Sequence, residues 1–443
     1  MNQENLEHTH NNSNMRKVAL TALAGTSIEW YDFFLYGAAA ALIFPTVFFG
    51  EETPSTALIL SLLTFAAGFI ARPIGGIIFG HFGDKIGRKK TLISALILMG
   101  ISSTLIGLLP TYAMIGVTAP ILLTLLRFAQ GLAIGGQWGG AMLLVTESAP
   151  SNQRGYYGAF AQAGAPIGVI LANLALIITS ALVSEEFFNT WGWRIPFLAS
   201  SVLIVISMYI QLNLEDTKAF KELVLHRNEQ QDDAESVIQR SPIIEAIRKY
   251  PKRIILAAGA FISVQVTFYI LIAFLLAYGV QSVNMARDDM LAAVLIASAI
   301  MVPVQFVFSS YSDRHGRRGI FMLGAVLSGL WAFAIFPLVD TGSFWLIVLA
   351  ITGGLVFLAM MYGPQAAFFT ELFSTEVRYS GATLGYQFGA IIGGAFAPTI
   401  AVKLWTELDI FWVSVYIAFA ALLSLLSVMA LTETYQTDLN KTG

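Results

Sequence analysis

Long apolar runs are the feature of this sequence that most restricts its fold. A helix of about 20 mostly apolar residues crosses a hydrocarbon core of about 30 Å. Of the 443 residues, 56% are hydrophobic and only 12% are charged, which excludes a soluble enzyme. We therefore predict an all-α membrane protein with twelve transmembrane helices, at residues 18–49, 56–80, 91–109, 117–145, 155–183, 194–213, 253–281, 290–311, 319–338, 343–370, 379–403 and 409–431.

Lysine and arginine residues gather on one side of the predicted membrane. Twenty of the 25 fall in segments that are cytoplasmic if the N-terminus is inside, whereas the external loops are acidic. The positive-inside rule then places both termini in the cytoplasm. No signal peptide is predicted. The chain divides into a polar tail at 1–17, a six-helix half at 18–213, a cytoplasmic linker at 214–252, a second six-helix half at 253–432 and a tail at 433–443.

Motifs for enzymatic or metal chemistry are missing from this sequence. It has no cysteine, and all five histidines lie outside the long apolar runs, so proton chemistry inside the membrane must use carboxylates. It also has no P-loop and no nucleophile motif. We expect neither an enzyme nor an ATP-driven pump, and no metal or nucleic-acid partner.

Two charged motifs occur twice, once in each predicted half. DKIGRK at 84–89 recurs as DRHGRR at 313–318, and a Glu-x6-Arg spacing is also repeated. Each copy lies at a predicted cytoplasmic helix end, where carboxylates can pair with arginines or helix termini. We predict a charge network that closes this side; the alternative is that the cations only fix the topology. Its members are Asp84, Arg88, Glu147, Arg154, Asp313, Arg317, Glu371 and Arg378.

Four ionisable residues lie within the predicted spans, Glu29, Asp32, Arg72 and Arg127. Each is costly in lipid and needs a partner or a wet cavity. Glu29 and Asp32 are three residues apart and share one face of a helix, at a depth similar to that of Arg127. Two such carboxylates cannot both ionise cheaply. We expect Asp32 to be the main proton carrier and Glu29 its modulator or a second carrier; a static ion pair with Arg127 is the alternative.

Arg72 and Arg127 are the candidates for holding an anion, because a guanidinium grips a carboxylate at two points. The alternative for Arg72 is that it snorkels toward the lipid headgroups. The second half offers only uncharged polar groups in the interior of its spans, and bonding between helices is as good an explanation for each of them. The candidate substrate-binding residues are Arg72, Arg127, Tyr31, Tyr36, Gln137, Trp138, Gln162, Gln265, Tyr269, Tyr362, Gln365 and Gln387.

Several motifs resemble those of the major facilitator superfamily, and within it the metabolite:H⁺ symporter family, over essentially the whole chain. One departure concerns Gln137, where the family commonly carries Glu, which affects the proton stoichiometry. The sugar-porter motif after the sixth span is missing. The matching pieces are the two repeated loops, Arg127-x2-Gln130-Gly131, IEWYDFFLYG at 28–37, ARPIGG at 71–76, WGWRIPF at 191–197 and YGPQ at 362–365.

The resemblance implies a monomeric transporter of the bacterial inner membrane that works by alternating access and needs no cofactor besides the proton gradient. The leading hypothesis is proton-coupled import of a small organic acid such as shikimate or a di- or tricarboxylate. An osmolyte carrier for proline or betaine is the alternative, with Trp30, Tyr31, Phe34 and Tyr36 around a quaternary ammonium. That branch often carries a long C-terminal coiled coil, which the short tail here disfavours. A membrane receptor is a remote third possibility.

Overall fold

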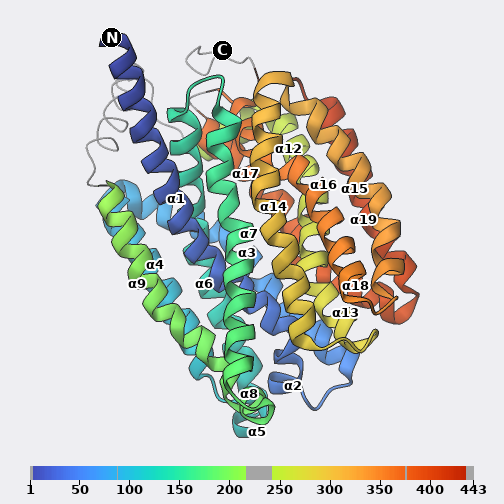
Figure 1. Cartoon of the computed structure of the whole chain (residues 1–443). Helices are drawn as coiled ribbons and strands as arrows, with labels where there is room; N and C mark the ends of the chain where they lie inside the picture. The colour runs from blue at the N-terminus through green and yellow to red at the C-terminus, as the bar shows by residue number, and fades with distance from the viewer. Residues whose placement is uncertain (1–2, 87, 216–241, 375–376, 436–443) are drawn as a thin grey trace.

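The structure, a computed structural model, describes residues 3–86, 88–215, 242–374 and 377–435. These residues form helices joined by short loops, with no strand in the ranges just given (Figure 1). Because hydrocarbon offers no hydrogen bonds, a helix that satisfies its own backbone is the stable form of such apolar segments. The expected all-helical fold is confirmed.

The first half contains the helices coloured blue to green in Figure 1. They are α1 (Gln3–Leu42), α2 (Phe44–Phe48), α3 (Pro54–Ile86), α4 (Arg88–Leu108), α5 (Tyr112–Ile115), α6 (Thr118–Ser148), α7 (Arg154–Leu182), α8 (Glu185–Thr190), η1 (Gly192–Arg194) and α9 (Ile195–Glu215).

The second half begins with a short helix that lies inside the predicted linker at 214–252, of which residues 216–241 lie outside the described ranges. Its helices are α11 (Pro242–Lys249), α12 (Pro251–Tyr269), η2 (Ile270–Phe274), α13 (Leu275–Gln281), α14 (Arg287–His315), α15 (Arg317–Val339), α16 (Phe344–Glu371), α17 (Arg378–Ala390), η3 (Ile391–Ala395), α18 (Ala397–Glu407) and α19 (Ile410–Ala430).

Ten helices in the described part of the chain are long and apolar enough to cross a membrane, and each overlaps a predicted span. The two remaining predicted spans correspond to α1, which carries Glu29 and Asp32, and to α4, whose apolar stretch Ile93–Leu108 is shorter. The total of twelve therefore stays a prediction.

Two of the predicted spans are not regular helices. A π-helical turn, η2, joins α12 to α13 within 253–281, and a second, η3, joins α17 to α18 within 379–403. Such turns are rare and are frequent at functional sites. Both lie beside the interface between the halves, where η2 contacts α1 and η3 contacts α3.

The two halves meet along two seams. On one seam α7 packs against α14 (Figure 1) and α16. On the other seam α3 packs against η3 and α18. Both ends of the described chain lie at the same end of the bundle. Met15 belongs to the same apolar cluster as Ala149 and Tyr157, near the start of α7, and Thr434 bonds to Glu371 at the end of α16. Two chain ends on the same side of the bundle are what a chain that crosses the membrane an even number of times would have.

Candidate functional site

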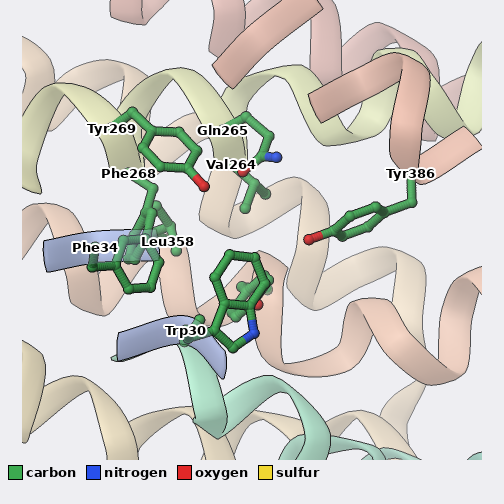
Figure 2. Close-up of a pocket in the computed structure, with 10 residues that line it drawn as sticks. Trp30, Phe34, Val264, Gln265, Phe268, Tyr269, Leu358 and Tyr386 are labelled. Atoms are coloured by element: carbon green, nitrogen blue, oxygen red, sulfur yellow. The ribbon is translucent and has the colours of Figure 1, made fainter. Parts of the chain in front are cut away.

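A narrow cavity lies between the two halves, walled by α1 and α7 on one side and by α12, α16 and α17 on the other (Figure 2). Its free space of about 10 Å³ holds no more than a single water molecule. A ligand of several carbon atoms requires the halves to move apart. The lining residues are Trp30, Phe34, Ala165, Val264, Gln265, Phe268, Tyr269, Leu358, Tyr362 and Tyr386.

Three of the candidate substrate-binding residues, Gln265, Tyr269 and Tyr362, lie in this wall. Gln265 is buried and its Nε2 atom has no hydrogen-bond partner, so an amide donor is available there. Tyr269 and Tyr386 approach the cavity from opposite sides in Figure 2. The wall is therefore aromatic, with an amide and several phenol groups among the rings.

Three other candidates, Tyr31, Tyr36 and Gln162, are not among the residues that line the cavity. Tyr31 donates to the Pro196 carbonyl of α9 at 2.9 Å, and Tyr36 donates to Thr64 at 2.6 Å. Gln162 of α7 donates to the Tyr362 carbonyl at 3.2 Å and ties the two halves together.

Two further glutamines, Gln365 and Gln387, are buried with their Oε1 atoms unpaired, outside the set of lining residues. The side chains of Gln137 and Trp138 lie outside the described residues.

Arg72 and Arg127 are buried in aromatic surroundings behind the α1 wall of the cavity. They are 1% and 0% exposed, so Arg72 does not snorkel toward a headgroup, and that alternative is wrong. Their guanidinium carbons lie 4.3 and 4.1 Å from the centre of one ring, that of Phe33. The Nε and Nη2 atoms of both arginines have no hydrogen-bond partner.

Asp32 is 1% exposed, and neither of its carboxylate oxygens has a hydrogen-bond partner. It does not form a direct ion pair with Arg127, so a static pair between Asp32 and Arg127 is not seen. Arg127 instead donates to Gln130 at 3.0 Å, and Gln130 donates to the Ser103 hydroxyl at 2.7 Å. That hydroxyl lies close to the Asp32 carboxylate. The Ser200 hydroxyl also lies close to Asp32, but neither serine is hydrogen-bonded to the carboxylate, so the hydrogen-bonded chain from Arg127 ends at Ser103. Glu29, one turn earlier on α1, is half-buried.

A second charged site joins the two halves at the end of the bundle where both ends of the described chain lie. Arg317 of α15 donates to both carboxylate oxygens of Glu371, at 2.9 and 3.0 Å, and to Asp313 at 2.7 Å. Arg154 of the first half lies 4.0 Å from Glu371. We call Arg154, Asp313, Arg317 and Glu371 the Arg317 cluster.

Asp313 also crosses between the halves. Its two oxygens accept the backbone N–H groups of Gly155 and Tyr156 at 2.7 and 2.9 Å, so it caps the first turn of α7. The contact requires glycine at 155, because a Cβ atom there would lie 2.6 Å from Arg317 and 2.8 Å from Asp313. Among the other predicted network members, Arg378 is buried and donates to the Phe373 carbonyl at 3.4 Å. The side chains of Asp84, Arg88 and Glu147 lie outside the described residues.

Sequence reasoning missed Glu433, which extends this site beyond α19. Its carboxylate accepts the backbone N–H groups of Arg317 and Arg318, each at 2.9 Å, and so caps α15. The adjacent Thr434 donates to Glu371 at 2.8 Å. The available signal was an acidic residue directly after the last apolar run.

The WGWRIPF motif has a structural explanation. Arg194 donates to the Gly107 and Leu109 carbonyls at 3.0 and 2.6 Å and thereby caps the end of α4. Trp193 is fully buried against Phe44, Phe48 and Phe197. This motif therefore fixes the packing of α4 and α9, away from the cavity.

Two helical halves around a central cavity, with buried charges and a charge cluster at one end, define a membrane transporter. The model of the Major Facilitator Superfamily matches residues 30–384. The chain belongs to this superfamily, as its sequence motifs indicated, and its relatives and structural neighbours are transporters rather than enzymes.

Similar proteins cover nearly the whole chain. The inner membrane metabolite transport protein YhjE of Escherichia coli K12 is 38% identical over 97% of this chain and 96% of its own length. The shikimate transporter of the same organism is 36% identical over 96% of this chain and 97% of its own length. A proline/betaine transporter of Salmonella typhimurium is 34% identical, over 95% of this chain and 84% of its own length.

Solved structures agree on the fold. A partially occluded inward-open structure of the xylose transporter XylE from E. coli has a TM-score of 0.72 at 17% identity, over 95% of this chain and 99% of that one. A crystal structure of a D-xylose-proton symporter gives a TM-score of 0.73 at 17% identity, over 96% of this chain and 99% of that one. The chain is a multi-pass transporter of the bacterial inner membrane, as expected from its sequence.

Proposed function

We propose that this protein is a monomeric proton-coupled symporter that imports a small organic acid. In the proposed topology, twelve helices span the membrane and both termini, with the Arg317 cluster, face the cytoplasm. One observation supports the proposal that the substrate is an acid. Arg72 and Arg127 are fully buried, and neither makes an ion pair. Buried charges are costly unless they are paired, so an anion entering this region stabilises it.

The buried charges also support coupling to one proton. Asp32 and the two guanidinium groups are all buried, and together they carry a net charge of +1 when Asp32 is ionised and +2 when it is protonated. An anion that enters with the proton offsets the added positive charge, and no cofactor beyond the proton gradient is needed.

Alternating access is supported by the contacts of the Arg317 cluster. The bonds from Asp313 to α7 join the two halves at one end and must break when that end opens. Gln305 of α14 similarly donates to the Ala159 carbonyl of α7 at 3.1 Å. These contacts hold the proposed cytoplasmic side closed.

A second candidate is a carrier of proline or betaine, favoured by the aromatic cavity wall. Trp30 and Phe34 stack with ring centres 5.2 Å apart and face Tyr269 and Tyr362 across the cavity. Such rings bind quaternary ammonium groups. The residues Tyr31 and Tyr36, expected to share this role, lie elsewhere.

The experiment that separates these candidates is uptake by proteoliposomes that carry an inside-alkaline proton gradient. Shikimate, α-ketoglutarate, citrate, proline and betaine are compared in turn. We expect accumulation of an acid, and accumulation only of betaine or proline would overturn the proposal. Asp32→Asn should abolish accumulation while leaving exchange of substrate across the membrane. Arg72→Gln should lower the uptake of acids more than the uptake of zwitterions. An equal loss of uptake for both would show that Arg72 does not recognise the anion.

A further inference from the structure

Phe33 of α1 lies between the only two arginines buried in the central membrane region of the described chain. The ring is 1% exposed, and the guanidinium carbons of Arg72 and Arg127 lie 4.3 and 4.1 Å from its centre. The two guanidinium carbons are therefore no farther apart than the sum of these two distances. They come from different helices, α3 and α6, and Phe33 is a ring that both contact.

Each guanidinium has additional rings of its own. Arg72 lies 4.5 Å from the ring centre of Phe69 and 5.3 Å from that of Trp30. Arg127 lies 4.3 Å from Tyr36 and 4.7 Å from Phe65. Trp30 precedes Phe33 by one turn of α1 and Tyr36 follows it by one turn, so the arginines lie on either side of Phe33 along the helix.

The aromatic rings replace the carboxylates that usually accompany buried arginines. The negative face of an aromatic ring attracts a cation, and more strongly when water is excluded. Here the rings hold the charges in place while the Nε and Nη2 atoms stay unpaired. The charges are thus available to an anion or to a change at a neighbouring carboxylate.

The two arginines face different functional groups. Arg127 connects through Gln130 and Ser103 toward Asp32, as described above. Arg72 lies close enough to the cavity tyrosines Tyr269, Tyr362 and Tyr386 to interact with them electrostatically. Arg127 is therefore the guanidinium that interacts with the proton carrier, and it also interacts with Tyr269, whereas Arg72 interacts with all three cavity tyrosines.

We propose that Phe33 is a positioning residue that holds Arg72 and Arg127 at a fixed separation, so that proton binding at Asp32 strengthens anion binding at Arg72. This inference rests on the proposed function. When Asp32 is neutral, the positive field of Arg127 is no longer balanced and adds to that of Arg72 across the ring. Binding of the anion favours the protonated carboxyl in return, because such coupling between two sites is reciprocal.

Neighbouring phenylalanines supply matched controls. Phe65 contacts Arg127 alone, and Phe69 contacts Arg72 alone, while Phe33 contacts both. All three rings are buried, and each is replaced by leucine in turn. Phe33→Tyr keeps the ring and serves as the conservative variant.

The first test compares gradient-driven accumulation of radiolabelled shikimate with its counterflow, which needs no proton gradient. Phe33→Leu should lower the ratio of accumulation to counterflow at least about tenfold, and Phe33→Tyr should restore it. Phe69→Leu should raise KM while keeping the ratio, and Phe65→Leu should change KM little. Equal losses of both activities in Phe33→Leu, or the same profile for all three leucine variants, would overturn the proposal.

The second test needs no transport and therefore separates this inference from the proposed function. Melting temperatures are measured for Arg72→Gln, Arg127→Gln and the double variant, with and without Phe33→Leu. The two arginine effects should be non-additive with Phe33 present, and this non-additivity should change by about 2 °C or more in the Phe33→Leu background. The same non-additivity in both backgrounds would refute the positioning role of Phe33. Failure of the wild type to accumulate any acid would overturn the proposed function alone.

Discussion

Replacing Asp313 with asparagine should open the end of the bundle that the Arg317 cluster closes. The carboxylate accepts two backbone N–H groups of α7 and the Nη1 group of Arg317. An asparagine has one acceptor oxygen in place of two, and its NH₂ group would face an N–H donor. The substitution keeps the size of the side chain, so the packing of α14 is preserved.

The size of the effect follows from which bonds cross between the halves. The bond to Arg317 joins α14 and α15 within one half and persists when the end opens. The bonds to Gly155 and Tyr156 do cross, and asparagine can keep only one of them. A hydrogen bond to a charged group contributes about 2 kcal/mol, so the open population should rise about 30-fold.

The absence of cysteine from the sequence provides the assay. Ala366 of α16 is 2% exposed, packs on Ala161 of α7, and lies between the Arg317 cluster and the cavity lining. A single thiol from Ala366→Cys is labelled with a membrane-impermeant maleimide in inside-out vesicles. Its labelling rate follows the open population when opening is fast relative to labelling.

Two controls make the result specific. Glu245→Cys on the exposed face of α11 should label at the same rate with and without Asp313→Asn. Asp340→Asn removes a carboxylate at the other end of α15, where Tyr278 donates to it at 2.6 Å, and should not change labelling at 366. An unchanged rate for Ala366→Cys in the Asp313→Asn background would refute the role given to Asp313.

Two other substitutions test packing and capping. Gly394→Ala would bring a methyl group within 2.9 Å of the Phe69 ring and 3.0 Å of the ring of Tyr269, which lines the cavity, so uptake should fall at least about fivefold. Gly319→Ala, with open space around it, should leave uptake unchanged in the same assay. Arg194→Ala should destabilise the protein by about 3 kcal/mol, because two buried carbonyls lose their donor. Lys403→Ala, at an exposed ion pair, should lie within about 0.5 kcal/mol of the wild type. Thermal unfolding measures the stability of Arg194→Ala and of Lys403→Ala. A similar loss of stability in these two variants would contradict the argument that Arg194 caps α4.

Sequence patterns predicted the charged groups better than their partners. The repeated motifs indicated Asp313, Arg317 and Glu371 because ordered charges recur at equivalent helix ends. They did not indicate that Asp313 binds the backbone of Gly155 and Tyr156. That contact joins segments far apart in the chain, and it depends on how the halves dock rather than on local spacing.

Helical periodicity explains why some of the aromatic residues expected at the substrate site on α1 line the cavity and others do not. Trp30 and Phe34 are four residues apart and share the face that lines the cavity. Tyr31 is rotated about 100° from Trp30 and faces α9 instead. The spacing predicts which residues share a face, but it does not say which neighbour each face meets. The contacts of Phe33 with two arginines were missed for that reason.

The two π-helical turns occur in the second half, whereas α1, α3 and α6, which carry the buried charges, are α-helical throughout their described residues. A regular helix fixes the height and direction of every side chain, while a π turn accommodates an extra residue by a local change of register. The shape of the cavity wall can thus be altered by insertions or substitutions near η2 and η3 without displacing the guanidinium groups. On the proposed function, substitutions near η2 and η3 would change which substrate fits the cavity without displacing the proposed proton carrier on α1.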